Sequence, residues 1–355
     1  MVSKTQIALL LILAVLIPSV LFSGCLGGPS PGPNDSNQTV PPVNDTNSTN
    51  NSTNNSTNNS TNNSTPNTNP NTTVPSSPSS ISVSAFNIQI FGQSKAAKAD
   101  VMDVLAKTIR NYDIVGIQEI RDASETSLPA LVALINSGTD ENGRPYNYDY
   151  VVSDRLGRST SKEQYAYIYD KNTVYVASEP LVYPEPDGDS FEREPYMVTF
   201  RSNTGTFDAV LILIHTKPED AKNEIGELDA VVRYAKSIYH GQNNYIIMGD
   251  FNADGSYFNE SGPSALKSDE YIWLIGNDVV TTTKTQNTYD RIVITKSLEP
   301  YFTNNSGVFN YTAEYGLNQT QTTAVSDHYP IYAEFWTVLG NWYRSLFLHM
   351  GAHSV

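Results

Sequence analysis

The sequence predicts a single α/β sandwich over residues 81–336. Two observations lead to this fold class. Short apolar runs typical of buried strands alternate along this region with longer runs whose apolar residues recur every three or four positions, as on one face of a helix. A region of roughly 250 residues with this alternation fits one α/β domain.

The first predicted elements are a strand, a helix and a second strand. The strand at Ile81–Ile90 alternates apolar and polar residues. Ser94 is a suitable helix cap, and the helix that it starts extends to Asn111. One face of this helix is apolar and contains Ala97, Val101, Leu105 and Ile109. The segment Asp113–Gln118 then predicts a buried strand.

The rest of the domain continues the alternation. Two further helices are predicted at Leu128–Ile135 and Glu219–Tyr239, and the second has an apolar face made of Ile225, Leu228, Val232, Ala235 and Ile238. Further strands are predicted at Tyr165–Tyr169, Thr173–Ala177, Met197–Arg201, Phe207–Ile214, Tyr245–Met248, Arg291–Ile294 and Ile331–Phe335. Strands and helices mixed in this order support the sandwich.

Residues 1–25 predict a targeting segment. Lys4 precedes a nearly all-apolar run from Ile7 to Phe22, and the small residues Ser23-Gly24 directly precede Cys25. The run is short for a membrane-spanning helix, so a signal peptide of an exported chain is favoured. The residues before Cys25 resemble a lipobox, which makes Cys25 a candidate for lipid attachment; the alternative is an uncleaved N-terminal anchor. Cys25 is the only cysteine, so no intrachain disulfide can form.

Two further segments flank the domain. Residues 26–80 are mostly Pro, Asn, Ser and Thr, and they cannot bury enough apolar surface to offset the entropy of ordering, so we expect a disordered tether. Many of its asparagines lie in Asn-x-Ser/Thr sequons, so the tether is either glycosylated or an unmodified spacer. Residues 337–355 have an apolar helical face, which favours a helix packed on the domain over one lying on a membrane surface.

The formal net charge is −15. This charge argues against a nonspecific nucleic-acid binder that relies on a basic patch. It leaves open a metal-dependent enzyme that acts on a polyanion, because clustered carboxylates become locally positive once they hold divalent cations.

Five short motifs place polar side chains where predicted strands end. They are Ala85-Phe86-Asn87-Ile88-Gln89, Gln118-Glu119-Ile120-Arg121-Asp122, His215-Thr216-Lys217-Pro218, Gly249-Asp250-Phe251-Asn252-Ala253-Asp254 and Ser326-Asp327-His328-Tyr329-Pro330. These motifs supply carboxylates, amides and imidazoles but no thiol. Such ligands at several strand ends indicate a site for hard divalent metals and phosphoester chemistry.

Further motifs occur in order between these five, and they include Leu156-Gly157-Arg158, Lys162-Glu163, Arg193-Glu194-Pro195 and Tyr289-Asp290-Arg291-Ile292. With them the chain resembles the deoxyribonuclease I family, within the endonuclease/exonuclease/phosphatase superfamily, over nearly all of residues 81–336. Their order and spacing carry the resemblance, and the last two motifs point to its nuclease branch. The resemblance implies a four-layered α/β sandwich, in which two packed mixed sheets are flanked by helices.

The resemblance also implies the chemistry of each motif. His215 and His328 are expected to divide the acid and base work of phosphodiester hydrolysis, with Glu163 orienting His215 and Asp290 orienting His328. Mg²⁺ or Mn²⁺ is expected as the catalytic cofactor, with Ca²⁺ in support. The metal ligands implied by the resemblance are Glu119, Asn87, Asp250 and Asp327.

Substrate contacts follow from the same resemblance. Asn252 is expected to donate its amide to a phosphate oxygen, and five residues occupy positions that contact the DNA backbone or minor groove: Arg121, Arg158, Arg193, Thr285 and Tyr289. A structural calcium site is expected near Asp189, Phe191 and Glu194. The chain departs from the family at Gln89, where the family has arginine, and at Ser161, where it has a stacking aromatic residue.

These observations favour a metal-dependent endodeoxyribonuclease that leaves 5′-phosphate ends. We expect a monomer that is exported and anchored at the cell surface, lipidated or released outside the cell, in a prokaryotic and archaeal host. The alternatives are a phosphoesterase of the same fold that acts on phospholipid headgroups or nucleotides, and a catalytically inactive binding module. All four histidine and carboxylate positions are intact, which argues against the inactive module.

Overall fold

The computed structural model describes residues 79–339. The leader, nearly all of the tether and nearly all of the C-terminal tail lie outside the described residues, and so does Cys25. Among the described helices, none is both long enough and apolar enough to cross a membrane.

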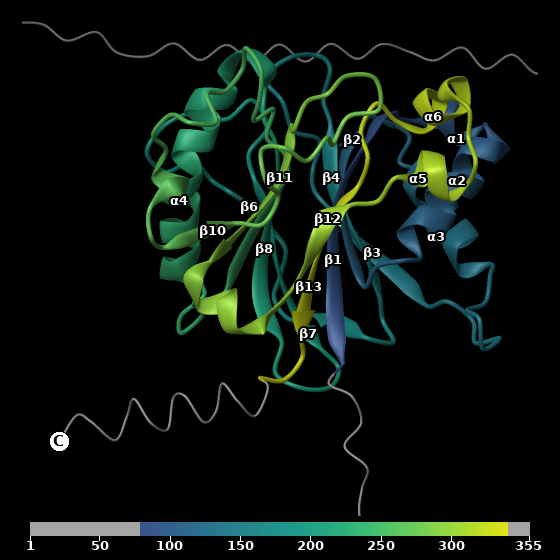
Figure 1. The fold of residues 1–355 in the computed structure, drawn as a ribbon, viewed down its shortest axis with the longest axis horizontal. Helices are drawn as coiled ribbons and strands as arrows, with labels where there is room; N and C mark the ends of the chain where they lie inside the picture. The colour runs from purple at the N-terminus through teal and green to yellow at the C-terminus, as the bar shows by residue number, and fades with distance from the viewer. Residues whose placement is uncertain (1–78, 340–355) are drawn as a thin grey trace, which may run out of the picture. The chain divides into compact units, whose positions relative to one another are not determined.

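Two β-sheets face each other, and helices cover their outer faces (Figure 1). The first sheet has six strands in the spatial order β12-β13-β1-β2-β4-β3. They are β1 (Ser80–Phe91), β2 (Ile114–Ile120), β3 (Tyr148–Val152), β4 (Gln164–Asp170), β12 (Phe302–Val308) and β13 (Ile331–Trp336). Strands β1 and β2 are parallel, and the other neighbours in this sheet are antiparallel.

The second sheet has seven strands in the order β10-β11-β9-β8-β7-β5, and β6 also pairs with β7. They are β5 (Val174–Val176), β6 (Leu181–Val182), β7 (Tyr196–Ser202), β8 (Asp208–His215), β9 (Tyr245–Asp250), β10 (Tyr271–Trp273) and β11 (Asp290–Thr295). Strands β8 and β9 are parallel. The predicted α/β sandwich of two mixed sheets between helical layers is confirmed.

Each outer layer of helices packs on one sheet. The first sheet is covered by α1 (Gln93–Ala96), α2 (Ala99–Ile109), α3 (Ser127–Asn136), α5 (Tyr311–Glu314) and α6 (Gln319–Val325). The second is covered by α4 (Ala221–Ile238). Three short 3₁₀ turns complete the described elements: η1 (Pro218–Asp220), η2 (Ala265–Lys267) and η3 (Lys296–Tyr301).

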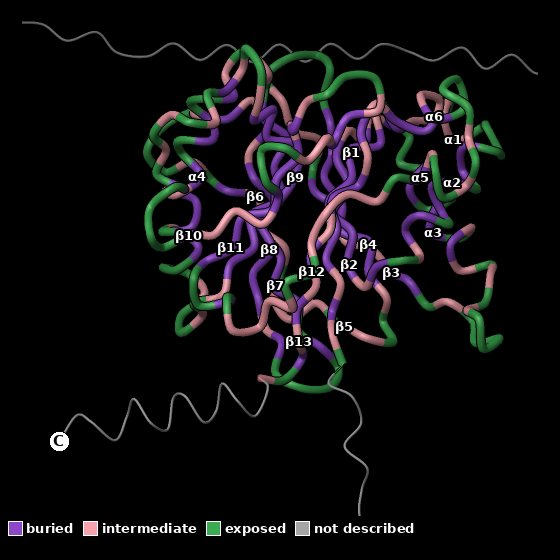
Figure 2. Tube along the Cα trace, in the orientation of Figure 1, coloured by how far each residue is buried: buried purple, intermediate pink, exposed green. Residues whose placement is uncertain are grey.

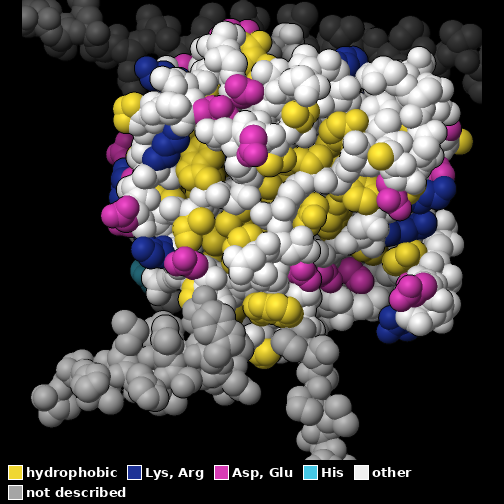
Figure 3. Space-filling view, in the orientation of Figure 1, with side chains coloured by type: hydrophobic (Ala, Val, Ile, Leu, Met, Phe, Trp, Pro, Cys, Tyr) yellow, Lys and Arg dark blue, Asp and Glu magenta, His cyan; other side chains and the backbone are white. Residues whose placement is uncertain are grey.

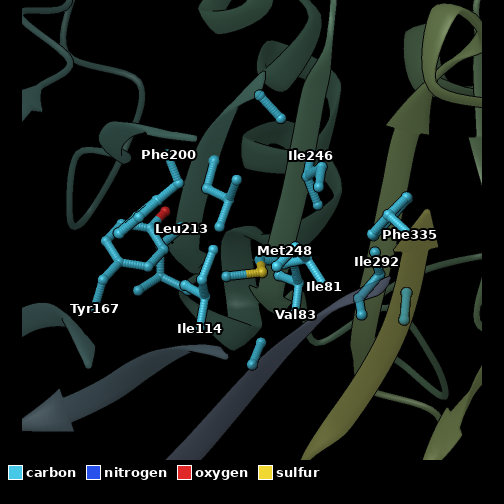
Figure 4. Close-up of a cluster of buried hydrophobic side chains, with 14 of the residues drawn as sticks. Ile81, Val83, Ile114, Tyr167, Phe200, Leu213, Ile246, Met248, Ile292 and Phe335 are labelled. Carbon is cyan, nitrogen blue, oxygen red and sulfur yellow. The ribbon is translucent and has the colours of Figure 1, made fainter. Parts of the chain in front are cut away.

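Three apolar clusters hold these layers together. The cluster between the sheets joins side chains such as Ile114 and Phe335 of the first sheet to Leu213 and Met248 of the second (Figure 4). A second cluster lies under α2, α3 and α6, and a third lies under α4. The strands are accordingly the most buried part of the chain (Figure 2).

Gly116 of β2 allows the two sheets to approach closely. A Cβ atom at this position would lie 2.7 Å from a methyl carbon of Leu213 and 2.8 Å from that of Met248. Real Cβ atoms do not show such distances, so a larger residue here would require the ends of the Leu213 and Met248 side chains to shift.

The first predicted helix differs from the structure. The chain forms the short α1 and then α2, because Lys98 adopts an extended backbone with φ −94° and ψ 100° between them. Ala97 is exposed, so its predicted place on the buried face was wrong. The predicted helix at Glu219–Tyr239 forms as η1 followed by α4, and Ile238, which was placed on its apolar face, is 37% exposed.

The two parallel strand pairs bring the candidate residues to one edge of the sandwich. In the first sheet, Asn87 lies near the end of β1 beside Gln118 of β2, one residue before Glu119. In the second sheet, His215 and Asp250 are partners at the ends of β8 and β9, and Asp250 also pairs with Asp290 of β11. Parallel strands end at the same edge, so four strands deliver polar side chains to one place.

Candidate active site

Asp250 lies at the centre of the site, between two imidazoles. Its Oδ2 atom is 3.6 Å from Nε2 of His215 and 3.5 Å from Nε2 of His328. The same oxygen accepts a hydrogen bond from the Asn87 side chain at 3.1 Å, and Oδ1 accepts one from the backbone N–H of Asn252 at 3.0 Å. Asp250 is only 2% exposed. Burial raises the pKa of Asp250, but the two histidines outweigh burial and lower that pKa below its usual range.

The first histidine pair is His215 with Glu163. Nδ1 of His215 lies 2.9 Å from Oε2 of Glu163, and this contact leaves Nε2 facing the site. Arg121 donates to the other oxygen of Glu163 at 2.8 Å. Burial alone raises the pKa of Glu163, but the hydrogen bond to His215 and the nearby positive charges lower it to about 2. Glu163 is therefore ionised, and it fixes both the orientation and the tautomer of the ring.

The second histidine pair is His328 with Asp290. Nδ1 of His328 lies 2.8 Å from Oδ2 of Asp290, and both side chains are buried. Burial lowers the pKa of His328, but the charges of Asp290 and Asp250 outweigh burial and raise that pKa to about 10. The two pairs therefore present one Nε2 atom each toward the same carboxylate. The partners themselves, Glu163 for His215 and Asp290 for His328, are those that the resemblance implies.

Glu119 and Asn87 lie together on the first-sheet side of the site. The Asn87 amide donates to Oε1 of Glu119 at 3.1 Å and so links Glu119 to Asp250. Oε2 of Glu119 accepts from the backbone N–H of Ile90 at 2.8 Å and lies 3.1 Å from Arg121. Glu119 has a positive φ of 63°, a backbone conformation that is uncommon for residues other than glycine and that occurs often at functional sites.

Asp327 directly precedes His328, in the segment between α6 and β13. Its Oδ2 accepts from the side-chain amide of Gln89 at 2.6 Å, so the residue that replaces the family's arginine is bound to the site itself. Its Oδ1 is buried without a hydrogen-bond partner among the described residues, and so is Oδ1 of Asp290. Buried carboxylate oxygens without partners are costly unless a cation or water satisfies them.

The donor set fits a hard divalent cation. The carboxylates of Glu119, Asp250 and Asp327 border the site together with Asn87, whose amide nitrogen donates to Glu119 and Asp250 and whose amide oxygen accepts from the backbone N–H of Gln89. Two carboxylate oxygens in the site lack a hydrogen-bond partner among the described residues. A compact group of Asp250, Asp290 and His328 also has ligand atoms within 4.8 Å of one another. His328 and Asp290 are already bound to each other, so we prefer the set that contains Glu119, and both sets share Asp250.

The proposed phosphate and DNA contacts differ in their surroundings. Asn252 has φ 47°, and its amide donates to the carbonyl oxygen of Thr216 at 3.1 Å beside Asp250. Tyr289 is half-buried with its ring 6.3 Å from that of His328, and Thr285 is exposed on the neighbouring loop. These residues surround the site, while their contacts with substrate stay predictions.

Two arginines are engaged within the protein. Arg193 is 8% exposed, and its guanidinium donates to the carbonyl oxygens of His215 and Thr216 at 2.9 to 3.1 Å. This geometry supports the end of β8 and gives no support to the predicted DNA contact of Arg193. Arg158 is more exposed, and it forms a 2.6 Å ion pair with Asp189, one of the predicted calcium ligands.

The predicted calcium region contains one carboxylate that the sequence interpretation missed. Oε1 of Glu185 accepts from the backbone N–H groups of Ser190 and Phe191 at 2.7 and 2.8 Å, and Oε2 of Glu194 is buried without a partner among the described residues. Burial raises the pKa of Glu185, and nearby acidic residues add to the effect. The acidic residues from Glu185 to Asp189 could have indicated this carboxylate from the sequence, but none of the motifs contains Glu185.

Comparisons with known proteins show the family to which the chain belongs. A model of the endonuclease/exonuclease/phosphatase family matches residues 84–328. Deoxyribonuclease gamma of Rattus norvegicus is 37% identical over 265 residues, which are 71% of this chain and 83% of that protein. Deoxyribonuclease-1 of Bos taurus is 36% identical over 265 residues, which are 71% of this chain and 91% of that protein.

A solved structure shares the fold. The endonuclease/exonuclease/phosphatase family protein from Leptotrichia buccalis superposes with a TM-score of 0.52 at 17% sequence identity, covering 72% of this chain and 99% of that chain. At this identity the likeness shows the fold alone.

Proposed function

The chain belongs to the endonuclease/exonuclease/phosphatase family and is a hydrolase of phosphodiester bonds, and on that premise we propose that it is a metal-dependent endodeoxyribonuclease. The observation that carries the proposal is the pair of buried histidine–carboxylate dyads whose Nε2 atoms both face Asp250. Such an arrangement provides both a base and an acid within reach of one phosphate. The names of the relatives favour DNA as the substrate.

Hydrolysis requires that a water attack phosphorus while the bond to the 3′ oxygen breaks. His215 is the proposed base, because Glu163 holds its Nδ1 and leaves Nε2 to accept the proton of the water. His328 is the proposed acid, because buried Asp290 holds its Nδ1 and stabilises the protonated ring, which can give its Nε2 proton to the leaving 3′ oxygen. The products are a 5′-phosphate end and a 3′-hydroxyl end.

Charge on the phosphate also has to be neutralised. A Mg²⁺ or Mn²⁺ ion held by Glu119, Asn87, Asp250 and Asp327 would supply positive charge for the transition state. Arg121 lies beside Glu119 and Glu163 and adds the nearest fixed positive charge. Ca²⁺ bound near Asp189, Phe191 and Glu194 would act at a distance, by holding the loop that leads into Arg193.

We expect the surface of the protein to attract DNA only weakly. The chain carries a net charge of −15, and among the described residues on the face drawn in Figure 3 the Lys and Arg side chains are scattered rather than gathered. Binding of DNA therefore depends on contacts near the site and on the bound cation rather than on a basic surface.

The central test is cleavage of supercoiled DNA with and without chelator. Residues 79–339 are expected to nick plasmid DNA in Mg²⁺ or Mn²⁺ and to lose that activity in excess EDTA, because the buried carboxylate oxygens without partners in the site call for a divalent cation. Gel electrophoresis of the plasmid measures the result, with sphingomyelin and a mononucleotide as parallel substrates. Full activity in excess chelator would sink the metal assignment, and faster hydrolysis of either control substrate would favour the alternative phosphoesterase.

We also propose that the enzyme is a monomer, exported and anchored at the surface of a prokaryotic, archaeal cell. The leader and the tether support this location. Ser79 and Thr337, at the two ends of the domain, are hydrogen-bonded at 2.6 Å, at the opposite end of β1 from Asn87. The described part of the chain therefore begins and ends at the edge of the domain opposite the site.

Cell fractionation tests this location. The chain is expected in the membrane fraction of its host, and Cys25→Ser is expected to release it if Cys25 carries the lipid. Immunoblotting of the membrane, cytosol and medium fractions measures the distribution. Recovery of the unaltered chain in the cytosol would contradict export.

A further inference from the structure

A bulge interrupts β1 where it reaches the site. The register between β1 and β2 shifts between Asn87 and Phe91, and two of the three residues in this bulge, Gln89 and Ile90, have positive φ values of 40° and 49°. A β-branched residue such as Ile90 rarely adopts this conformation, and Ile90 is 56% exposed, so its own packing does not explain it. Other contacts must hold the bulge.

The bulge orients two of the proposed metal ligands. Because the chain turns there, the backbone N–H of Gln89 donates to Oδ1 of Asn87 at 2.9 Å. The backbone N–H of Ile90 donates to Oε2 of Glu119 at 2.8 Å. A regular strand would direct these N–H groups into its ladder with β2, so the bulge is what fixes the side chains of Asn87 and Glu119.

Lys95 of α1 holds the bulge from outside the site. Its Nζ donates to the carbonyl oxygen of Ile88 at 2.8 Å and to that of Val325 at 2.8 Å. Ile88 is the first residue of the bulge, and Val325 ends α6, two residues before Asp327. Burial lowers the pKa of Lys95 to about 8, while the charges of Asp327 and Glu119 raise it, so the ammonium is largely protonated at neutral pH.

The ammonium group of Lys95 therefore joins the β1 bulge to the segment that follows α6. A second link lies beside it, because Ser326 donates its hydroxyl to the carbonyl oxygen of Asn87 at 2.6 Å and accepts from the backbone N–H of His328 at 3.1 Å. These segments are more than 200 positions apart in the sequence, as the separation of 239 between Ser326 and Asn87 shows. Their relative position decides how far Glu119 lies from Asp327.

We propose that Lys95 is a positioning residue that sets the geometry of the cation site, by clamping the β1 bulge to the segment that carries Asp327 and His328. The inference rests on the proposed function, since it assumes that these carboxylates hold a divalent cation. Lys95 bonds only to backbone carbonyl oxygens, so its role differs from that of a residue that binds substrate or metal. It acts on the metal through Asn87, Glu119 and Asp327.

The test compares Lys95→Met with Lys98→Met in the full chain. Methionine keeps the length of the apolar stem and removes the ammonium. Lys98 is exposed three residues away, so its replacement removes the same charge without breaking the clamp. Isothermal titration calorimetry with Mn²⁺ alone measures metal affinity, and plasmid nicking at saturating Mn²⁺ measures kcat and KM separately.

Lys95→Met is expected to weaken Mn²⁺ binding about tenfold or more, which is the scale seen when a residue that orients metal ligands is lost. Its kcat should fall while its KM for DNA stays within about twofold. Lys95→Arg should recover most of the affinity, because guanidinium can donate to both carbonyls. Lys98→Met should match the unaltered chain.

Unchanged Mn²⁺ affinity in Lys95→Met would overturn the proposal, even if its melting temperature fell, because the lysine would then support only the fold. An equal loss in Lys98→Met would also overturn it, since the effect would then be one of net charge. If Lys95→Met does not fold, Lys95→Gln replaces it and must show the same loss of affinity. Failure of the unaltered chain to bind Mn²⁺ or nick DNA would instead reject the proposed function, and this inference with it.

Discussion

Replacing His215 or His328 with alanine is expected to lower the rate of plasmid nicking by about two orders of magnitude or more, the usual effect of removing a positioned acid or base. Each ring presents Nε2 toward Asp250, and each is held through Nδ1 by a buried carboxylate. A water or a leaving oxygen can therefore exchange a proton with either ring. Initial rates at saturating metal measure the effect.

His240→Ala is the matched control, because His240 is exposed at the end of α4. It should leave the rate within about twofold. Circular dichroism melting of all three variants separates catalytic loss from unfolding. If His215→Ala or His328→Ala keeps nearly the full rate and an unchanged melting temperature, that histidine is structural and the proposed division of acid and base work is wrong.

Asp250→Asn is expected to cost at least as much activity, about a hundredfold to a thousandfold, on the scale of losing one preorganised electrostatic group. The carboxylate accepts from Asn87 and from the backbone of Asn252 while it faces both imidazoles. An asparagine amide is neutral and turns an N–H₂ group toward one of these donors. The change therefore removes a proposed metal ligand and the charge that raises the pKa of His328 at the same time.

The pH dependence provides a second measurement for this variant. With Asp250 neutral, one cause of the raised pKa of His328 is absent, so that pKa should fall. As the pH is raised, activity that depends on protonated His328 should therefore begin to fall at a lower pH in Asp250→Asn than in the unaltered chain. Asp103→Asn, at an exposed position in a surface ion pair with Lys107, is the control. A pH profile and a rate equal to those of the control would show that Asp250 is not central to the site.

The strongly apolar elements were predictable from sequence. Strands such as β4, β7, β8 and β9 carry apolar runs that tertiary context did not override, and each formed within one or two residues of its predicted bounds. The strand β12 was missed because its sequence, Phe302–Val308, is largely polar, and it forms by pairing with β13 at the edge of the first sheet. The short strands β3, β6 and β10 were missed for the related reason that pairing partners, rather than local pattern, define them.

The break between α1 and α2 shows that local sequence patterns are also an incomplete guide to helices. The apolar spacing from Ala97 to Ile109 favours one helix, but the chain restarts at Lys98. Lys95, in the short α1, reaches the carbonyl oxygens of Ile88 and Val325. No local pattern reveals these bonds, because their acceptors are backbone atoms of segments far away in the chain.

The sequence by itself determined the chemistry available to this protein and the strand ends that carry it. It identified Asn87, Glu119, Asp250 and His328 as candidate site residues, because each lies in a short motif beside an apolar run, and such runs are local patterns. Only the tertiary structure decided that Asp250 lies between two imidazoles, that Arg193 turns inward, and that Lys95 joins two halves of the site. The physical reason is that sheet register and packing bring together residues distant in the chain, and these contacts leave no periodic signal in the sequence around either partner.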